Sequence, residues 1–172
     1  MQKIKPVMMG ATAAFLLAGP ALAQTPAEFY KGKTVEFIIG YATGGSSDTY
    51  SRMIAQHMGK HIPGNPTVVV RNMPGGGGIV AANHLTQVAA RDGTNLHALM
   101  SNMMTLQALG NPAVKFDTRD FAFIGNSTTA PNVMAAWHTT GINDFNDLKK
   151  RNAIVGAPMG TSGALYAELM NG

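Results

Sequence analysis

Three short segments of the chain could bind an anion through backbone N–H groups. They are residues 44–47 (Gly-Gly-Ser-Ser), 75–78 (four glycines) and 160–162 (Gly-Thr-Ser), and each precedes a stretch with helical spacing. The first N–H groups of a helix have no partner inside the helix and lie at the positive end of its dipole. Such a junction binds a carboxylate or phosphate without any Arg or Lys. Glycine lets a ligand approach the backbone closely, and Ser and Thr add hydroxyl donors.

A plainer interpretation exists for each segment taken alone, namely that its glycines only make tight turns in an α/β fold. We favour this interpretation for residues 75–78, which carry no hydroxyl group and would serve close packing. The hydroxyl groups of the other two segments favour ligand contact. A nucleotide site is not indicated, because residues 40–45 do not match G-x-G-x-x-G and no G-x-x-x-x-G-K-[ST] occurs.

Residue types used by enzymes are present, but not in catalytic arrangements. The chain has no G-x-S-x-G motif, and the serines of residues 46–47 have no obvious His partner. His57 and His61 are spaced to share a metal on one helix face, but no carboxylate is placed to complete the ligand set. Asp48 and Arg52 have the i, i+4 spacing of a helix salt bridge. We therefore expect no catalysis, no metal and no cofactor.

Hydrophobic patterning places the first two glycine segments at strand-to-helix junctions. The predicted elements are strands at 34–39, 67–70 and 95–100, a helix from Ser47 to the stop at Pro63, and a helix across 81–89. The end of the first strand is apolar on both faces, as expected of a buried parallel strand. Strand, glycine loop and helix, repeated in this order, predict an α/β fold with a parallel sheet and right-handed crossovers.

A second unit is predicted to start near Leu106. Its pattern indicates strands at 121–125, 133–137 and 153–157, a short charged helix at 143–151, and a helix that follows Ser162. The chain ends inside that last helix, and three strands with one unfinished helix have too little to cover their sheet. We therefore expect a first lobe at 24–105 and a second lobe at 106–172 that is truncated.

The N-terminus predicts export. Lys3 and Lys5 precede an apolar stretch at 7–17 that is too short to span a bilayer, and residues 21–23 have the small-residue pattern of a signal-peptidase site. We expect residues 1–23 to be a signal peptide and the protein to be periplasmic. The alternative is an uncleaved membrane anchor.

Charge and cysteine content exclude other classes. The chain has a formal net charge of +4, part of which comes from the lysines of the predicted signal peptide. No basic helix or pattern of aromatic residues with Arg indicates a nucleic-acid binder. There are no cysteines, which rules out disulfides and thiolate metal sites.

Five segments, in order along the chain, resemble the Bug family, the periplasmic substrate-binding receptors of tripartite tricarboxylate transporters. They are residues 35–52 (VEFIIGYATGGSSDTYSR), 68–77 (VVVRNMPGGG), 90–94 (ARDGT), 130–133 (APNV) and 156–162 (GAPMGTS). The resemblance implies a fold like that of type II periplasmic binding proteins, with two lobes, central mainly parallel sheets, and here an incomplete second lobe. It also implies a monomer that binds a small carboxylate and delivers it to the membrane subunits of a transporter.

The resemblance also gives a set of ligand-binding residues, carried over position by position. They are Tyr41, Thr43, Gly44, Gly45, Ser46 and Asp48 in the first jaw, Asn102 after the third strand, and Thr128, Gly160, Thr161 and Ser162 in the second lobe. Many family members have Phe-x-Pro-Gly-Gly where this chain has Tyr-Ala-Thr-Gly-Gly at 41–45, so the jaw and its ligand are expected to differ. Met103 and Met104 suggest a partly apolar pocket wall.

Two other functions remain open at the level of sequence. The first is a secreted α/β hydrolase-like enzyme that uses Ser46 or Ser162 as nucleophile. The second is a ligand-sensing domain of a signalling system. The residues do not indicate which carboxylate would be bound.

Overall fold

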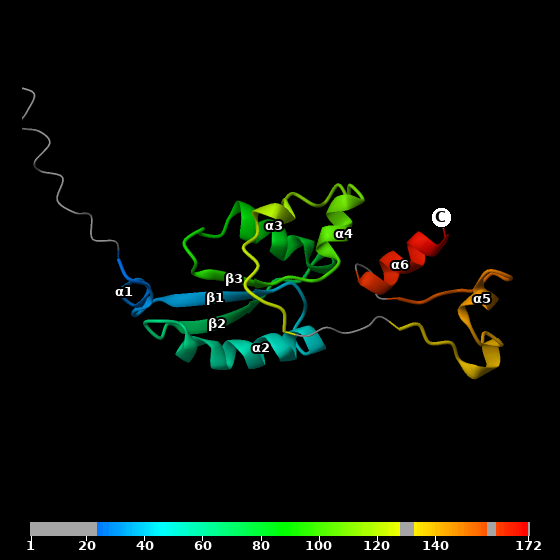
Figure 1. The fold of residues 1–172 in the computed structure, drawn as a ribbon, viewed down its shortest axis with the longest axis horizontal. Helices are drawn as coiled ribbons and strands as arrows, with labels where there is room; N and C mark the ends of the chain where they lie inside the picture. The colour runs from blue at the N-terminus through cyan, green and yellow to red at the C-terminus, as the bar shows by residue number, and fades with distance from the viewer. Residues whose placement is uncertain (1–23, 128–132, 158–160, 172) are drawn as a thin grey trace, which may run out of the picture.

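A computed structural model describes residues 24–127, 133–157 and 161–171 of the chain (Figure 1). The predicted signal peptide at 1–23 lies outside the described residues. The α-helices and strands are α1 (Pro26–Tyr30), β1 (Thr34–Ile39), α2 (Ser46–Met58), β2 (Thr67–Asn72), α3 (Ile79–Gln87), β3 (Asn95–Ala98), α4 (Met103–Ala108), α5 (Phe145–Leu148) and α6 (Ser162–Asn171). Single 3₁₀ turns lie at Gly59–His61, Gly76–Gly78, Thr118–Asp120 and His138–Thr140.

The three strands form one parallel sheet in the order β2-β1-β3. The central strand β1 is apolar at its end, and Val35, Ile38 and Ile39 are almost completely buried. Burial on both faces is expected for a central parallel strand, because helices cover both sides of such a sheet. Figure 1 shows α2 on one side of the sheet and α3 with α4 on the other. The predicted α/β class, the parallel sheet and its three strands are confirmed, although β2 runs to Asn72 and β3 ends at Ala98.

The core next to the sheet is built from helices and the segment that follows them. Ile79, Ala82, Met103 and Phe116 are buried together. Residues packed against this cluster are Leu99, Met100, Leu106, Val114 and Phe121. Residues up to Phe121 therefore pack with the unit built on the sheet, and the predicted division into lobes at 24–105 and 106–172 stays a prediction.

The glycine run at 75–78 serves close packing. All four glycines have positive φ, from 55° at Gly76 to 143° at Gly75. A Cβ atom on Gly40 would lie 2.8 Å from the Cα atom of Gly78, which real Cβ atoms do not tolerate. The run therefore brings the start of α3 against the end of β1, as the plainer interpretation of this segment predicted.

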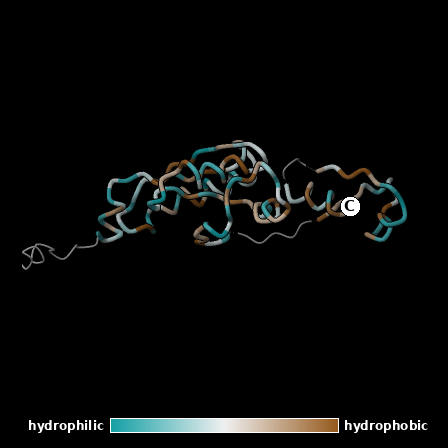
Figure 2. The backbone as a smooth tube through the Cα atoms, turned by 90° about the horizontal axis from the view of Figure 1, so that it is seen from above, coloured by the Kyte–Doolittle hydropathy of each residue, from teal (hydrophilic) through white to brown (hydrophobic). Residues whose placement is uncertain are grey.

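The strands predicted beyond the sheet are wrong. Residues 121–125, 133–137 and 153–157 form no strand, and apart from Phe121 their large apolar side chains are open to solvent, with 75% exposure at Ile124, 86% at Val133 and complete exposure at Ile154. Hydrophobic positions consequently occur along the C-terminal segment as well as around the sheet (Figure 2). A strand requires a neighbour for its backbone N–H and C=O groups, and apolar patterning does not supply one. Among the described residues these segments pair with no strand, and the backbone hydrogen bonds of Phe121 and Trp137 belong to local turns.

Two helices in the same region agree with the sequence in kind. The charged helix predicted at 143–151 is reduced to α5, which begins with a capping box formed by Asp144 and Asp147. The last predicted helix is present as α6, which begins at Ser162 itself, one residue earlier than predicted. Within the three described stretches, no helix combines the length and apolar composition required to cross a bilayer.

Candidate functional site

An open pocket of about 510 Å³ lies at the carboxyl end of the sheet. Four segments meet there: the loop after β1, the start of α2, the loop after β3, and the start of α6. The lining residues are Tyr41, Ala42, Thr43, Gly45, Ser46, Ser47, Met100, Asn102, Thr161 and Ser162. Because the strands are parallel, their carboxyl ends share one edge of the sheet, where ligands of α/β proteins commonly bind.

Two helix starts contribute to this pocket. Helix α2 has Gly45 at its N-cap position, with no side chain capping its first N–H groups. Thr161 precedes α6, and its hydroxyl oxygen accepts a hydrogen bond from the Ala164 N–H at 3.4 Å. Both helices are long enough to carry a dipole whose positive end faces an anion at the N-terminus. No charged side chain is among the residues that line the pocket.

Seven of the predicted ligand-binding residues line the pocket: Tyr41, Thr43, Gly45, Ser46, Asn102, Thr161 and Ser162. Gly44 and Asp48 are adjacent to it without lining it. Thr128 and Gly160 lie outside the described residues. The lining also includes Ala42, Ser47 and Met100, which the resemblance did not assign as ligand-binding residues.

Asp48 holds the loop after β1 and does not face the pocket. Its side chain is buried and accepts hydrogen bonds from the Gly44 N–H at 2.9 Å, from Arg52 Nε at 3.0 Å and from Asn72 Nδ2 at 2.8 Å. The hydrogen bonds from Arg52, then Asn72 and Gly44, lower the pKa of Asp48 to about 2. The carboxylate is therefore charged and fully engaged, which removes the repulsion that an acid facing an acidic ligand would cause. Asp48 is not among the residues that line the pocket, and its predicted contact with a ligand stays a prediction.

Asn72, which the sequence interpretation did not assign to the site, contacts the loop after β1. Its Nδ2 atom donates to the Tyr41 carbonyl oxygen at 2.9 Å as well as to Asp48, and its Oδ1 atom accepts from Arg52 Nη2. Strand alternation carries a signal for this role, because Asn72 lies on the same face of β2 as Val68 and Val70. A polar residue on a strand face that a helix covers needs partners, and α2 provides them.

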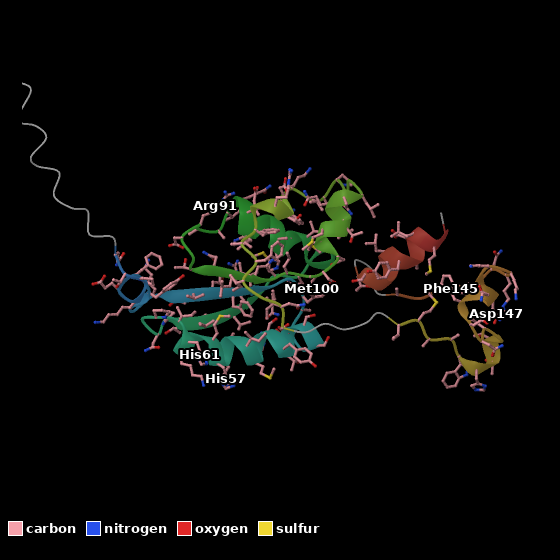
Figure 3. The ribbon with its side chains drawn as sticks, in the orientation of Figure 1. His57, His61, Arg91, Met100, Phe145 and Asp147 are labelled. Atoms are coloured by element: carbon pink, nitrogen blue, oxygen red, sulfur yellow. The ribbon has the colours of Figure 1, made fainter. Side chains whose placement is uncertain are left out.

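Tyr41 and Met100 shape the walls of the pocket. The Tyr41 hydroxyl donates to the Gly77 carbonyl oxygen at 3.3 Å, and burial raises the pKa of this phenol, so it stays protonated. Met100 lies near the Ser47 hydroxyl, with 4.0 Å between oxygen and sulfur (labelled in Figure 3). The apolar wall comes from Met100, and the predicted contribution of Met103 is wrong because Met103 is fully buried in the core. Met104 does not line the pocket either.

The two histidines considered as metal ligands lie on the outside of the molecule. His57 is near the end of α2 and His61 is in the 3₁₀ turn that follows, with both side chains directed away from the sheet (Figure 3). Among the described residues, no three His, Asp or Glu side chains are grouped so that they could hold a metal ion.

Comparison with known proteins gives two distant relatives. A "UPF0065 protein in gbd 5'region" of Cupriavidus necator is 42% identical over 87 residues, which cover 50% of this chain and 25% of the relative. A "UPF0065 protein in the TAR-I ttuE-ttuC' intergenic region" of Agrobacterium vitis is 31% identical over 137 residues, which cover 78% of this chain and 38% of the relative. The chain thus spans between a quarter and two fifths of the length of these relatives. No protein-family model matches the chain.

Proposed function

We propose that the protein is a receptor of the Bug family that binds a small di- or tricarboxylate and presents it to the membrane subunits of a tripartite transporter. Both relatives carry the designation UPF0065, which is that of the Bug receptors. This designation supports a binding protein and gives no support to an enzyme. The ligand, the transporter and the periplasmic location are parts of the proposal that the relatives' names do not address.

The observation that carries the proposal is the meeting of two helix starts in one pocket without charged side chains. Removing water from a carboxylate costs several kcal/mol unless other donors replace that water. The first N–H groups of α2 and α6, together with the hydroxyls of Ser46, Ser47 and Ser162, are donors of the required kind. Donors at two separate helix starts suit a ligand with more than one carboxylate.

The shape of the pocket agrees with a small ligand. Binding sites for small molecules commonly enclose about 300–1,000 Å³, and this pocket has about 510 Å³. It is still open to solvent, which fits a receptor that closes around its ligand by a hinge motion of two parts. Closure would exclude water and strengthen each hydrogen bond to the acid.

The competing hydrolase proposal lacks a base for its nucleophile. A serine nucleophile needs a His or another base within hydrogen-bonding distance. Ser46 and Ser162 both line the pocket, and among the described residues that line it there is no histidine. The structure offers no specific observation in favour of the sensing domain, since a sensor and a transport receptor would share the same pocket.

The test is a thermal-shift screen of the purified protein with succinate, malate and citrate, followed by calorimetry. We expect at least one of these acids to raise the melting temperature, because a ligand present at 100 times its Kd stabilises the folded state by about 2.7 kcal/mol. Succinamide, which has the same shape without charge, is the control and should have no effect. If no acid is bound, or if succinamide binds as well as succinate, carboxylate recognition by this pocket is refuted.

A further inference from the structure

We propose that Asn72 is a positioning residue, which holds residues 41–45 in the conformation that lines the pocket without contacting the ligand itself. The predicted effect of Asn72 on ligand affinity rests on the proposed function. The predicted effect of Asn72 on the loop does not, and it can be measured without ligand.

The side-chain amide of Asn72 joins three elements at one point. It lies at the end of β2 and donates both to the Tyr41 carbonyl oxygen at 2.9 Å and to Asp48 Oδ1 at 2.8 Å. Its own oxygen accepts from Arg52 on α2. The end of the edge strand, the loop after β1 and the first turns of α2 are thereby connected through one amide group. Asn72 is not among the residues that line the pocket.

The loop is held at two backbone groups, and Asn72 acts on both. At one end, the Tyr41 carbonyl oxygen accepts directly from the Asn72 amide. At the other end, the Gly44 N–H donates to Asp48, whose second oxygen bonds to Asn72. Ala42 and Thr43, between these points, are exposed and form part of the pocket wall. Removing the amide would therefore release one end of this wall and loosen the carboxylate that holds the other.

Asparagine fits this position because the site requires two donors and one acceptor on a short side chain. Asn supplies two N–H donors and a carbonyl acceptor, and all three are used here. Aspartate has the same shape but cannot donate when ionised, and it would place a second carboxylate against Asp48. A side chain that only filled space would tolerate Asn72→Asp, whereas a positioning residue would not.

The experiment measures hydrogen exchange of the Gly44 amide in the wild type, Asn72→Ala and Asn72→Asp. Hydrogen bonds to charged groups are among the stronger ones in proteins, so we expect the protection factor of Gly44 to fall by about tenfold or more in both variants. Lowering the pH should partly restore protection in Asn72→Asp only, since protonation gives the introduced carboxyl group one donor for Asp48. Protection factors remove the intrinsic pH dependence of exchange.

Arg71→Ala is the matched control. Arg71 is the preceding residue on β2, its side chain lies on the opposite face, and it forms an ion pair with Glu36 at 3.1 Å. Its removal should leave Gly44 protection unchanged. The amide of Ile38 in the buried central strand reports whether each variant is folded. If Asn72→Ala does not fold, Asn72→Ser, whose side chain is too short to reach Tyr41 and Asp48 together, takes its place.

The outcomes separate this inference from the proposed function. Unchanged Gly44 protection in the folded Asn72 variants overturns the inference, whether or not the protein binds an acid. If citrate or succinate binds the wild type, calorimetry should show about tenfold weaker binding in Asn72→Ala and none of this loss in Arg71→Ala. Loss of Gly44 protection with unchanged affinity would also overturn the role in binding. If the wild type binds none of succinate, malate and citrate, the proposed function fails, while the exchange experiment still decides the positioning role.

Discussion

Asp48 and Gly45 are three residues apart and have different roles, since Asp48 holds the loop after β1 and Gly45 lines the pocket. The buried carboxylate of Asp48 holds the Gly44 N–H and the first turns of α2 together, and it is turned away from the ligand pocket. Gly45 then begins α2 as its N-cap and lines the pocket itself. Because glycine at the N-cap has no side chain, the first N–H groups of the helix remain accessible to a ligand oxygen. Substitution at Gly45 should therefore affect ligand binding far more than folding.

For Gly45→Val we expect ligand affinity to fall by about a hundredfold, because the branched side chain blocks N–H donors to a charged ligand, and such hydrogen bonds contribute about 1.5–3 kcal/mol each. The fold should survive with a loss of about 1 kcal/mol, since valine is a poor N-cap. Gly45 has φ of −81°, and a Cβ atom there meets nothing within 4 Å. Calorimetry and urea denaturation measure the two effects.

Gly125→Val serves as the control for Gly45→Val, because a Cβ atom at Gly125 also meets nothing within 4 Å and this glycine does not line the pocket. Undiminished affinity of Gly45→Val for an acid that binds the wild type would contradict the assignment of this loop to the site.

His97 on β3 should make stability depend on pH. Both ring nitrogens are buried, with no hydrogen-bond partner in the part of the chain that the structure describes, and burial lowers the pKa of His97 from 6.5 to about 4. Between these pH values the unfolded chain binds a proton that the folded chain does not, so stability falls as the pH decreases from 6.5 to 4. The loss should reach about 3 kcal/mol and level off at lower pH.

Urea denaturation at several pH values measures the effect of His97. The variant His97→Leu should abolish this part of the pH dependence, whereas replacing the exposed His57 with Gln should leave it unchanged. Equal pH profiles for the wild type and His97→Leu would show that the imidazole is protonated or solvated in the folded protein.

Apolar patterning predicted one strand correctly and another wrongly. β1 was predicted because its apolar run ends at a glycine loop, and the structure confirms it with Ile38 and Ile39 buried on opposite faces. The pattern at 153–157 is equally apolar, yet Ile154 is exposed. The difference is that β1 has a hydrogen-bonded strand on each side. The local sequence pattern does not show whether a distant segment will pair with a strand.

Two neighbouring methionines of α4 provide a test of packing. Met103 is fully buried in the core cluster, whereas Met104 is about half exposed. We expect Met103→Ala to lower the free energy of unfolding by about 2–5 kcal/mol, because it removes buried surface and leaves a cavity. Met104→Ala, with the same change in helix propensity, should cost about 0.5 kcal/mol or less. Similar losses in urea denaturation would show that α4 does not pack as described.

The pocket as a whole could be anticipated only in part. The residue types at 44–47 and 160–162 were enough to predict backbone N–H and hydroxyl donors at two helix starts. In the structure, Thr161 and Ser162 line the same pocket as Ser46. Asn72 escaped prediction because its role depends on β2 lying beside β1, with α2 above both. The hydrogen bonds of Asp48 to Gly44, Arg52 and Asn72 could not be predicted either, because residue type alone does not show which way an acidic side chain near a loop points. Geometry between distant segments decided each of these cases.

One consequence of the parallel sheet concerns how this protein can diversify. Since the loops after β1 and β3 leave from the same edge of the sheet, the proposed ligand would be recognised by loop residues, most of which lie outside the buried core. Ala42, Thr43 and Ser46 are exposed on that rim, while the buried residues of β1 beneath them carry the architecture. If the proposed function holds, single substitutions on this rim could change which acid is bound while the sheet beneath stays intact.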